Sequence, residues 1–89
     1  MNDIKDLEQI TSAMAATGFR LSWSQAGPMD SGYVEFNDGK KIVKIVKDKG
    51  QWMLKESREV LEPLGFWKPF NDTSEFRNAL LDYVKKQYI

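Results

Sequence analysis

The chain has 89 residues, of which 42% are hydrophobic and 29% are charged, and its 13 basic residues balance its 13 acidic ones. This length fits one domain near the lower limit for folding alone, and the composition is too apolar for a disordered chain. The chain contains neither histidine nor cysteine, which excludes disulfides, thiol nucleophiles, histidine acid–base catalysis and most metal sites. We therefore expect a single domain over residues 1–89 that is not an enzyme and carries no cofactor or metal.

The sequence gives no indication of membrane insertion or secretion. No stretch approaches the ~20 consecutive apolar residues that a membrane helix needs. The start of the chain, Met1 to Asp6, is polar and acidic and has no apolar segment behind it, unlike a secretory signal. The absence of cysteine also suits a reducing compartment. These features predict a cytoplasmic protein without membrane contact.

The first predicted element is a helix over residues 3–17. Its apolar residues recur at three- and four-residue steps, which places Leu7, Ile10 and Met14 on one face. Gly18 is a suitable residue to end this helix, because glycine adopts the left-handed conformation without a Cβ clash.

An antiparallel sheet is predicted after this helix. The first strand alternates Phe19, Leu21 and Trp23 with polar residues, the period of two that is typical of a strand with one buried face. Asp38-Gly39 favours a tight hairpin turn, which needs positive φ angles, and a second glycine-containing turn follows the third strand. The predicted strands are residues 19–24, 33–36, 41–47 and 51–55.

The third strand has two interpretations, which the sequence leaves open. A period of two places Val43 and Ile45 on one face and Ile42 and Val46 on the other. In a regular strand both faces would then carry apolar groups, one against the helices and one against a partner or a second copy. A bulge midway along the strand would instead reverse the facing and remove the second surface.

Two helices are predicted after the sheet. A short helix over residues 57–64 ends or kinks at Pro63, which cannot donate a backbone hydrogen bond. An aromatic loop, residues 65–70, follows it, and Asp72 caps the last helix. The apolar residues of this last helix cover an arc of about 200°, which is more than one packed face needs. We expect part of that arc to be left for a partner.

Together these elements predict an α+β fold. An N-terminal helix, a four-stranded antiparallel β-meander, a short helix and a C-terminal helix follow one another, with the helices packed on one sheet face. The open face would then carry the lysines. A chain of this size leaves little room for a substrate cleft.

The aromatic loop and the last helix predict the main function, which is binding of a protein partner. Tryptophan and phenylalanine are typical interface anchors, and a rigid, proline-bearing loop loses little entropy on binding. The alternative is that these rings complete the packing of a small core. We expect an adaptor, inhibitor or accessory protein, monomeric or homodimeric. The predicted protein-binding residues are Trp67, Phe70, Leu81 and Tyr88.

The charge distribution suggests an alternative function, nucleic-acid binding. Residues 1–39 contain two basic and six acidic residues, a net charge of −4, whereas residues 40–58 contain seven basic and two acidic residues, a net charge of +5. In a basic hairpin, the lysines could contact the phosphate backbone and a tryptophan could stack on a base. The alternative is that the lysines only protect an exposed sheet edge from aggregation. The residues that would bind nucleic acid are Lys40, Lys41, Lys44, Lys47, Lys49, Trp52 and Lys55.

Overall fold

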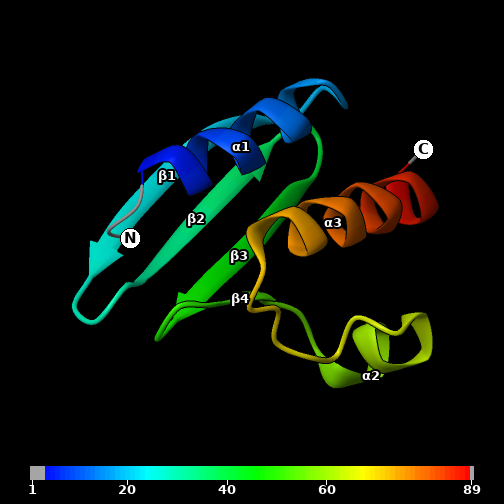
Figure 1. The fold of residues 1–89 in the computed structure, drawn as a ribbon. Helices are drawn as coiled ribbons and strands as arrows, with labels where there is room; N and C mark the ends of the chain where they lie inside the picture. Colours follow the sequence, from blue (N-terminus) through cyan, green and yellow to red (C-terminus); the bar gives the residue numbers. More distant parts are fainter. Residues whose placement is uncertain (1–3, 89) are drawn as a thin grey trace.

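The computed structural model describes residues 4–88 of the chain and the side chains of residues 6–87. Within this part, four antiparallel strands form one sheet in the order in which they occur along the chain (Figure 1). The strands are β1 (Arg20–Gly27), β2 (Ser31–Asn37), β3 (Ile42–Asp48) and β4 (Gln51–Leu54). The helices are α1 (Ile4–Ala15), α2 (Arg58–Leu61), the 3-10 helix η1 (Glu62–Leu64) and α3 (Thr73–Tyr88). The predicted α+β fold is thereby confirmed.

The two long helices, α1 and α3, lie next to each other on one face of the sheet, whereas α2 lies beyond the edge formed by β4 (Figure 1). At the end of α1, Gly18 has a φ of +89°, and the backbone N–H of Phe19 donates to the carbonyl oxygen of Met14 at 3.0 Å. At the start of α3, Oδ1 of Asp72 accepts a hydrogen bond from the backbone N–H of Ser74 at 2.8 Å. Both helix boundaries therefore follow from the sequence signals at those positions.

Strand β3 is regular along its contact with β2. The residues from Ile42 to Lys47 pair without interruption with those from Asn37 back to Gly32. This register excludes a bulge in β3, so Val43 and Ile45 face the helices and are buried. Ile42 lies on the opposite face, which the helices leave open, and 47% of its surface is exposed.

The irregularity lies in β1 instead. The register shifts between Leu21 and Trp23, so that Leu21 pairs with Phe36 while Trp23 pairs with Glu35. Because Phe36 is buried under the helices and its neighbour along β2 points the other way, Leu21 faces the helices and Trp23 faces the open side. The expectation that Leu21 and Trp23 share one face is wrong, because the bulge adds a residue between them.

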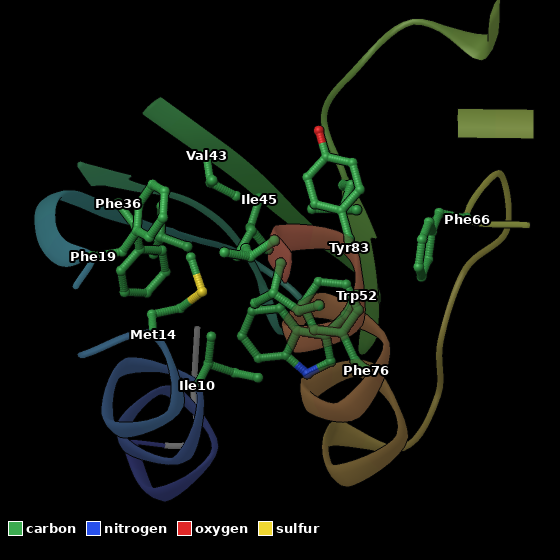
Figure 2. Packing of buried hydrophobic residues seen from close by; sticks show 14 of the residues in the cluster. Ile10, Met14, Phe19, Phe36, Val43, Ile45, Trp52, Phe66, Phe76 and Tyr83 are labelled. Atoms are coloured by element: carbon green, nitrogen blue, oxygen red, sulfur yellow. The ribbon is translucent and has the colours of Figure 1, made fainter. Parts of the chain in front are cut away.

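The core lies between the sheet and the pair of helices (Figure 2). Trp52 of β4 is fully buried, and its indole stacks on Phe76 of α3 with ring centroids 5.5 Å apart and planes 9° apart. Its Nε1–H donates to Oγ1 of Thr73 at 3.0 Å, so the only polar atom of the ring is satisfied. On the other side of the core, Met14 of α1 lies close to Phe19 (Figure 2).

The segment between β4 and α3 is anchored at two points. Phe66 is buried and meets Tyr83 of α3 edge-on, with ring centroids 5.6 Å apart. Phe70 forms an isolated antiparallel bridge with Trp52, in which each backbone N–H donates to the other residue's carbonyl oxygen at 2.8 Å. Pro63 lies inside η1, where the α-helix gives way to the 3-10 helix, as the missing donor predicts.

Candidate partner-binding face

The open face of the sheet carries large apolar side chains among charged ones. Strand pairing places Trp23, Glu35 and Lys44 in one row across β1, β2 and β3. Trp23 is 55% exposed, and Met53 on β4 is 37% exposed. The two side chains lie on the two edge strands of the sheet, and only Met53 borders the groove described next.

An apolar groove runs beside β4, between this open face and the aromatic loop. It has a volume of about 380 Å³. Trp67 is 49% exposed at this groove, whereas Leu61 and Phe66 in its wall are buried. The apolar residues that line it are Val46, Met53, Leu54, Leu61, Phe66, Trp67 and Pro69.

A second depression, the lysine hollow, lies at the β2–β3 turn and the neighbouring ends of β3 and β4. It has a volume of about 410 Å³. Its ionisable lining residues are Lys40, Lys41, Lys44, Lys55, Glu56 and Tyr83.

The β2–β3 turn is held by the carboxylate of Asp38. Its Oδ1 accepts hydrogen bonds from the backbone N–H groups of Lys41, at 2.7 Å, and Lys40, at 2.8 Å. These bonds hold the pKa of Asp38 below its usual value. The ionised side chain thereby fixes the backbone at the mouth of the lysine hollow.

Tyr33 and Glu35 form a polar pair in the middle of the open face. The hydroxyl of Tyr33 donates to Oε2 of Glu35, and Nζ of Lys55 lies 5.0 Å from the centre of the Tyr33 ring. Burial raises the pKa of Tyr33 to about 12, and the hydrogen bond to Glu35 and the charge of Glu35 add to this rise. Tyr33 therefore stays protonated at neutral pH, and its hydrogen bond to Glu35 fixes the position of the ring on this face.

We expect alkaline pH to destabilise the protein through Tyr33. The unfolded chain releases this proton near the ordinary pKa of 10.0, whereas the folded chain retains it up to about 12. Because the folded pKa is the higher one, the contribution of Tyr33 to stability is complete below pH 10 and is lost as the pH rises towards 12. Absorbance titration of tyrosinate, with Tyr33→Phe to assign the step, measures this pKa. The Glu35→Gln variant should titrate at lower pH, and an unchanged titration would contradict the assigned cause.

The structure separates the four residues that were predicted to bind a protein. Trp67 is half-exposed at the apolar groove, and Leu81 on α3 is half-buried. Phe70 is only 8% exposed and packs against Phe76 at a centroid distance of 5.5 Å, so its ring belongs to the core and is not an accessible anchor. The side chain of Tyr88 lies outside the described residues.

The residues predicted to bind nucleic acid are also divided. Lys47 is 3% exposed and Trp52 is fully buried, so neither can meet a phosphate or stack on a base. This corrects the prediction for both residues, and the reason is the strand period, which turns them towards the helices. Lys49 lies in the β3–β4 turn, at the opposite end of β3 from the lysine hollow. The four lysines that remain are those of the hollow.

Two residues of the open face were not nominated from the sequence, Trp23 and Met53. Met53 had a usable signal, because it stands between Trp52 and Leu54 on a strand and must point away from both. Trp23 had none, because only the bulge at Ser22 decides its side of the sheet.

Comparison of the chain with known proteins found no matching family model, no significantly similar curated protein and no significantly similar solved structure. Among the described residues, no cluster of three or more acidic side chains is placed to hold a metal ion. In the same part of the chain, no helix is both long enough and apolar enough to cross a bilayer.

Proposed function

We propose that this protein is a non-catalytic binding module that holds a segment of a partner protein in the apolar groove beside β4. The observation that carries the proposal is Trp67, a large side chain that is 49% exposed at a groove of about 380 Å³. Burying such a ring in an interface releases it from water, and tryptophan is among the residues that contribute most to binding.

The surroundings of Trp67 support this function, because they restrict the loop that carries it. Phe66, the preceding residue, is fixed by its edge-on contact with Tyr83. Pro69 follows two residues later, and Phe70 is bonded to the backbone of β4 through Trp52. A loop held on both sides of its exposed ring loses little conformational entropy when a partner binds.

The side chains that line the groove can also adapt to the apolar side chains of a partner. Met53 and Val46 form a paired row on the neighbouring strands β4 and β3 and line the groove together with Trp67. Methionine adapts to irregular surfaces because its side chain is unbranched and flexible. A partner that inserts one or two apolar side chains would therefore be enclosed between the sheet and the loop.

We expect Trp67→Ala to abolish or strongly weaken capture of the partner while the protein stays folded. Loss of a hot-spot tryptophan weakens binding by about 30-fold or more, whereas truncation of a half-exposed ring costs less than about 1 kcal/mol of folding stability. Tagged wild-type protein and variant are compared as baits in an extract of the source cells, and captured proteins are quantified by mass spectrometry. Titration calorimetry with the purified partner then gives the affinities.

Trp23→Ala is the matched control for this experiment. It removes the same side chain from the open face, but at β1, the edge of the sheet opposite to β4. A partner that is lost with Trp67→Ala and retained with Trp23→Ala supports the groove as the binding site. Equal capture by all three proteins, or unfolding of Trp67→Ala in circular dichroism, would contradict the proposed function.

A further inference from the structure

The apolar groove and the lysine hollow are neighbouring parts of one surface. Leu54, Lys55 and Glu56 line both depressions, so a chain that occupies the groove passes directly into the hollow. The two parts differ in chemistry, because the groove is formed mainly by apolar side chains and the hollow by lysines. A single bound segment would therefore meet both environments within a few residues.

The lysines of the hollow have no carboxylate partner within the described part of the chain. No acidic group of those residues lies within 4.0 Å of the ammonium groups of Lys40, Lys41, Lys44 or Lys55. Glu56, which also lines the hollow, accepts a hydrogen bond from the backbone N–H of Ser57 at 2.9 Å. The lining holds four lysines and the carboxylate of Glu56. With Asp38 at the mouth and Glu35 beside Lys44 also counted, the net charge stays positive in a concave site, where the field of the charges is concentrated.

Lys47 differs from the hollow lysines, because carboxylates of the protein itself balance its charge. Its Nζ lies 3.2 Å from Asp30 and 3.8 Å from Asp6, and the side chain is buried. The hollow lysines are exposed, and within the described residues none of them has a carboxylate at salt-bridge distance as compensation, while Lys55 lies over the ring of Tyr33. Acidic groups on a bound molecule would supply it.

A protein segment fits this surface better than a nucleic acid does. The wall formed by Val46 and Met53 accepts apolar side chains, which a phosphate backbone does not supply, and the lysines that also line the groove are only Lys55 and Lys68. Glu35 lies next to Lys44 in the register, and Glu56 next to Lys55 in the chain, so the cations do not form an uninterrupted track for a phosphate backbone. The net charge of the chain is also zero, unlike that of most nucleic-acid modules.

We infer that the lysine hollow receives aspartate and glutamate side chains of the segment that the groove binds. This inference rests on the proposed function and specifies its partner, which is a segment with an apolar anchor and a neighbouring cluster of acidic residues. The anchor occupies the groove at Trp67, and the carboxylates pair with the four lysines. Complementary charge of this kind speeds association and selects the partner.

The test selects ligands from a random peptide library displayed on phage, with the wild-type protein as the immobilised target. The dominant peptide is synthesised, and its affinity is measured for the wild type, for Lys44→Gln/Lys55→Gln and for Trp67→Ala at low and moderate salt. Lys49→Gln/Lys85→Gln is the matched control, because it removes two exposed lysines that line neither depression. Single-stranded and duplex oligonucleotides are titrated in parallel, and circular dichroism verifies that each variant is folded.

The expected result is a peptide in which an aromatic or aliphatic residue stands beside several acidic residues. Its binding should weaken about tenfold or more in Lys44→Gln/Lys55→Gln and with added salt, and change little in the control variant. Peptides that need Trp67 but lack acidic residues and bind Lys44→Gln/Lys55→Gln with unchanged affinity would overturn this inference and leave the proposed function intact. Selection of no peptide, or binding of oligonucleotides alone through the same lysines, would overturn both.

Discussion

Replacing Trp52 by alanine is expected to lower the free energy of unfolding by about 3–5 kcal/mol, the range for truncation of a large aromatic side chain in a core. The indole is fully buried and stacks on Phe76, so its removal leaves a cavity between the sheet and α3. The hydroxyl of Thr73 also loses its donor. Since a small domain has only about 5–15 kcal/mol of stability, this loss is a large fraction of the total. Urea denaturation followed by far-ultraviolet circular dichroism measures the change.

Trp67→Ala and Trp23→Ala are the controls for this prediction, because they remove the same side chain from surface positions. Each should change the unfolding free energy by less than about 1 kcal/mol. If Trp52→Ala were as stable as these two variants, the burial of Trp52 and its stacking on Phe76 would be wrong. The series also tells whether the groove tryptophan can be altered without loss of the fold, on which the binding experiments depend.

Removing both carboxylates beside Lys47 is expected to destabilise the protein by about 3 kcal/mol, because the ammonium group then stays buried without a counter-ion. Lys47 is 3% exposed, whereas the side chains of Asp6 and Asp30 are 33% and 36% exposed. Water near these two positions reduces the cost, so the lower part of the usual range applies. The variant is Asp6→Asn/Asp30→Asn, and chemical denaturation gives its unfolding free energy.

Lys47→Met gives the complementary measurement. It removes the buried charge but keeps an apolar stem against Trp52, whose ring centre lies 4.8 Å from Nζ in the native protein. Because both aspartates are partly hydrated, we expect a change of less than about 1 kcal/mol. Asp82→Asn, which breaks the exposed pair with Lys86, should change stability by less than about 0.5 kcal/mol. A double aspartate variant no less stable than Asp82→Asn would show that Lys47 does not depend on its partners.

These two predictions concern Lys47 and Trp52, which pair across β3 and β4, the two strands that line the groove. Along β4, Trp52 and Leu54 point into the core, and Met53 points to the groove. The alternation means that the core holds the strand in place while the opposite side chain remains accessible. We propose that a partner binds to this supported strand and the restrained loop beside it, and that little rearrangement accompanies binding.

Most of the fold could be predicted from the sequence, because the signals that determine it are local. The apolar period of residues 3–17, the glycine after it and the aspartate before α3 mark where helices begin and end. The period of two and the glycine-containing turns locate four strands. Neighbouring strands joined by short turns pair antiparallel, so the meander follows directly from these positions.

The chain's three tryptophans show what the sequence alone could not determine. Trp52 is in the core, Trp67 lies at the groove and Trp23 is on the open face. The sequence placed Trp23 and Trp52 in strands and Trp67 in a loop, but it did not show which of the three side chains is buried. Which of them is buried depends on the helices that cover one face and on a bulge in β1 that has no sequence signal. The sequence therefore identified the aromatic residues but not their sides of the sheet.

For the lysines, too, the sequence determined one part of the arrangement and the tertiary structure the other. Their concentration in residues 40–58 is visible in the sequence, and so is the period that turns Lys47 towards the helices. Only the tertiary structure brings Asp6 and Asp30 to Lys47 and places Lys40 beside Lys55 in one hollow. Local patterns thus determined the elements and their order, because each depends on residues a few positions apart. The composition of the candidate site was decided by packing, because its residues are distant in the chain and meet only when the sheet and helices assemble.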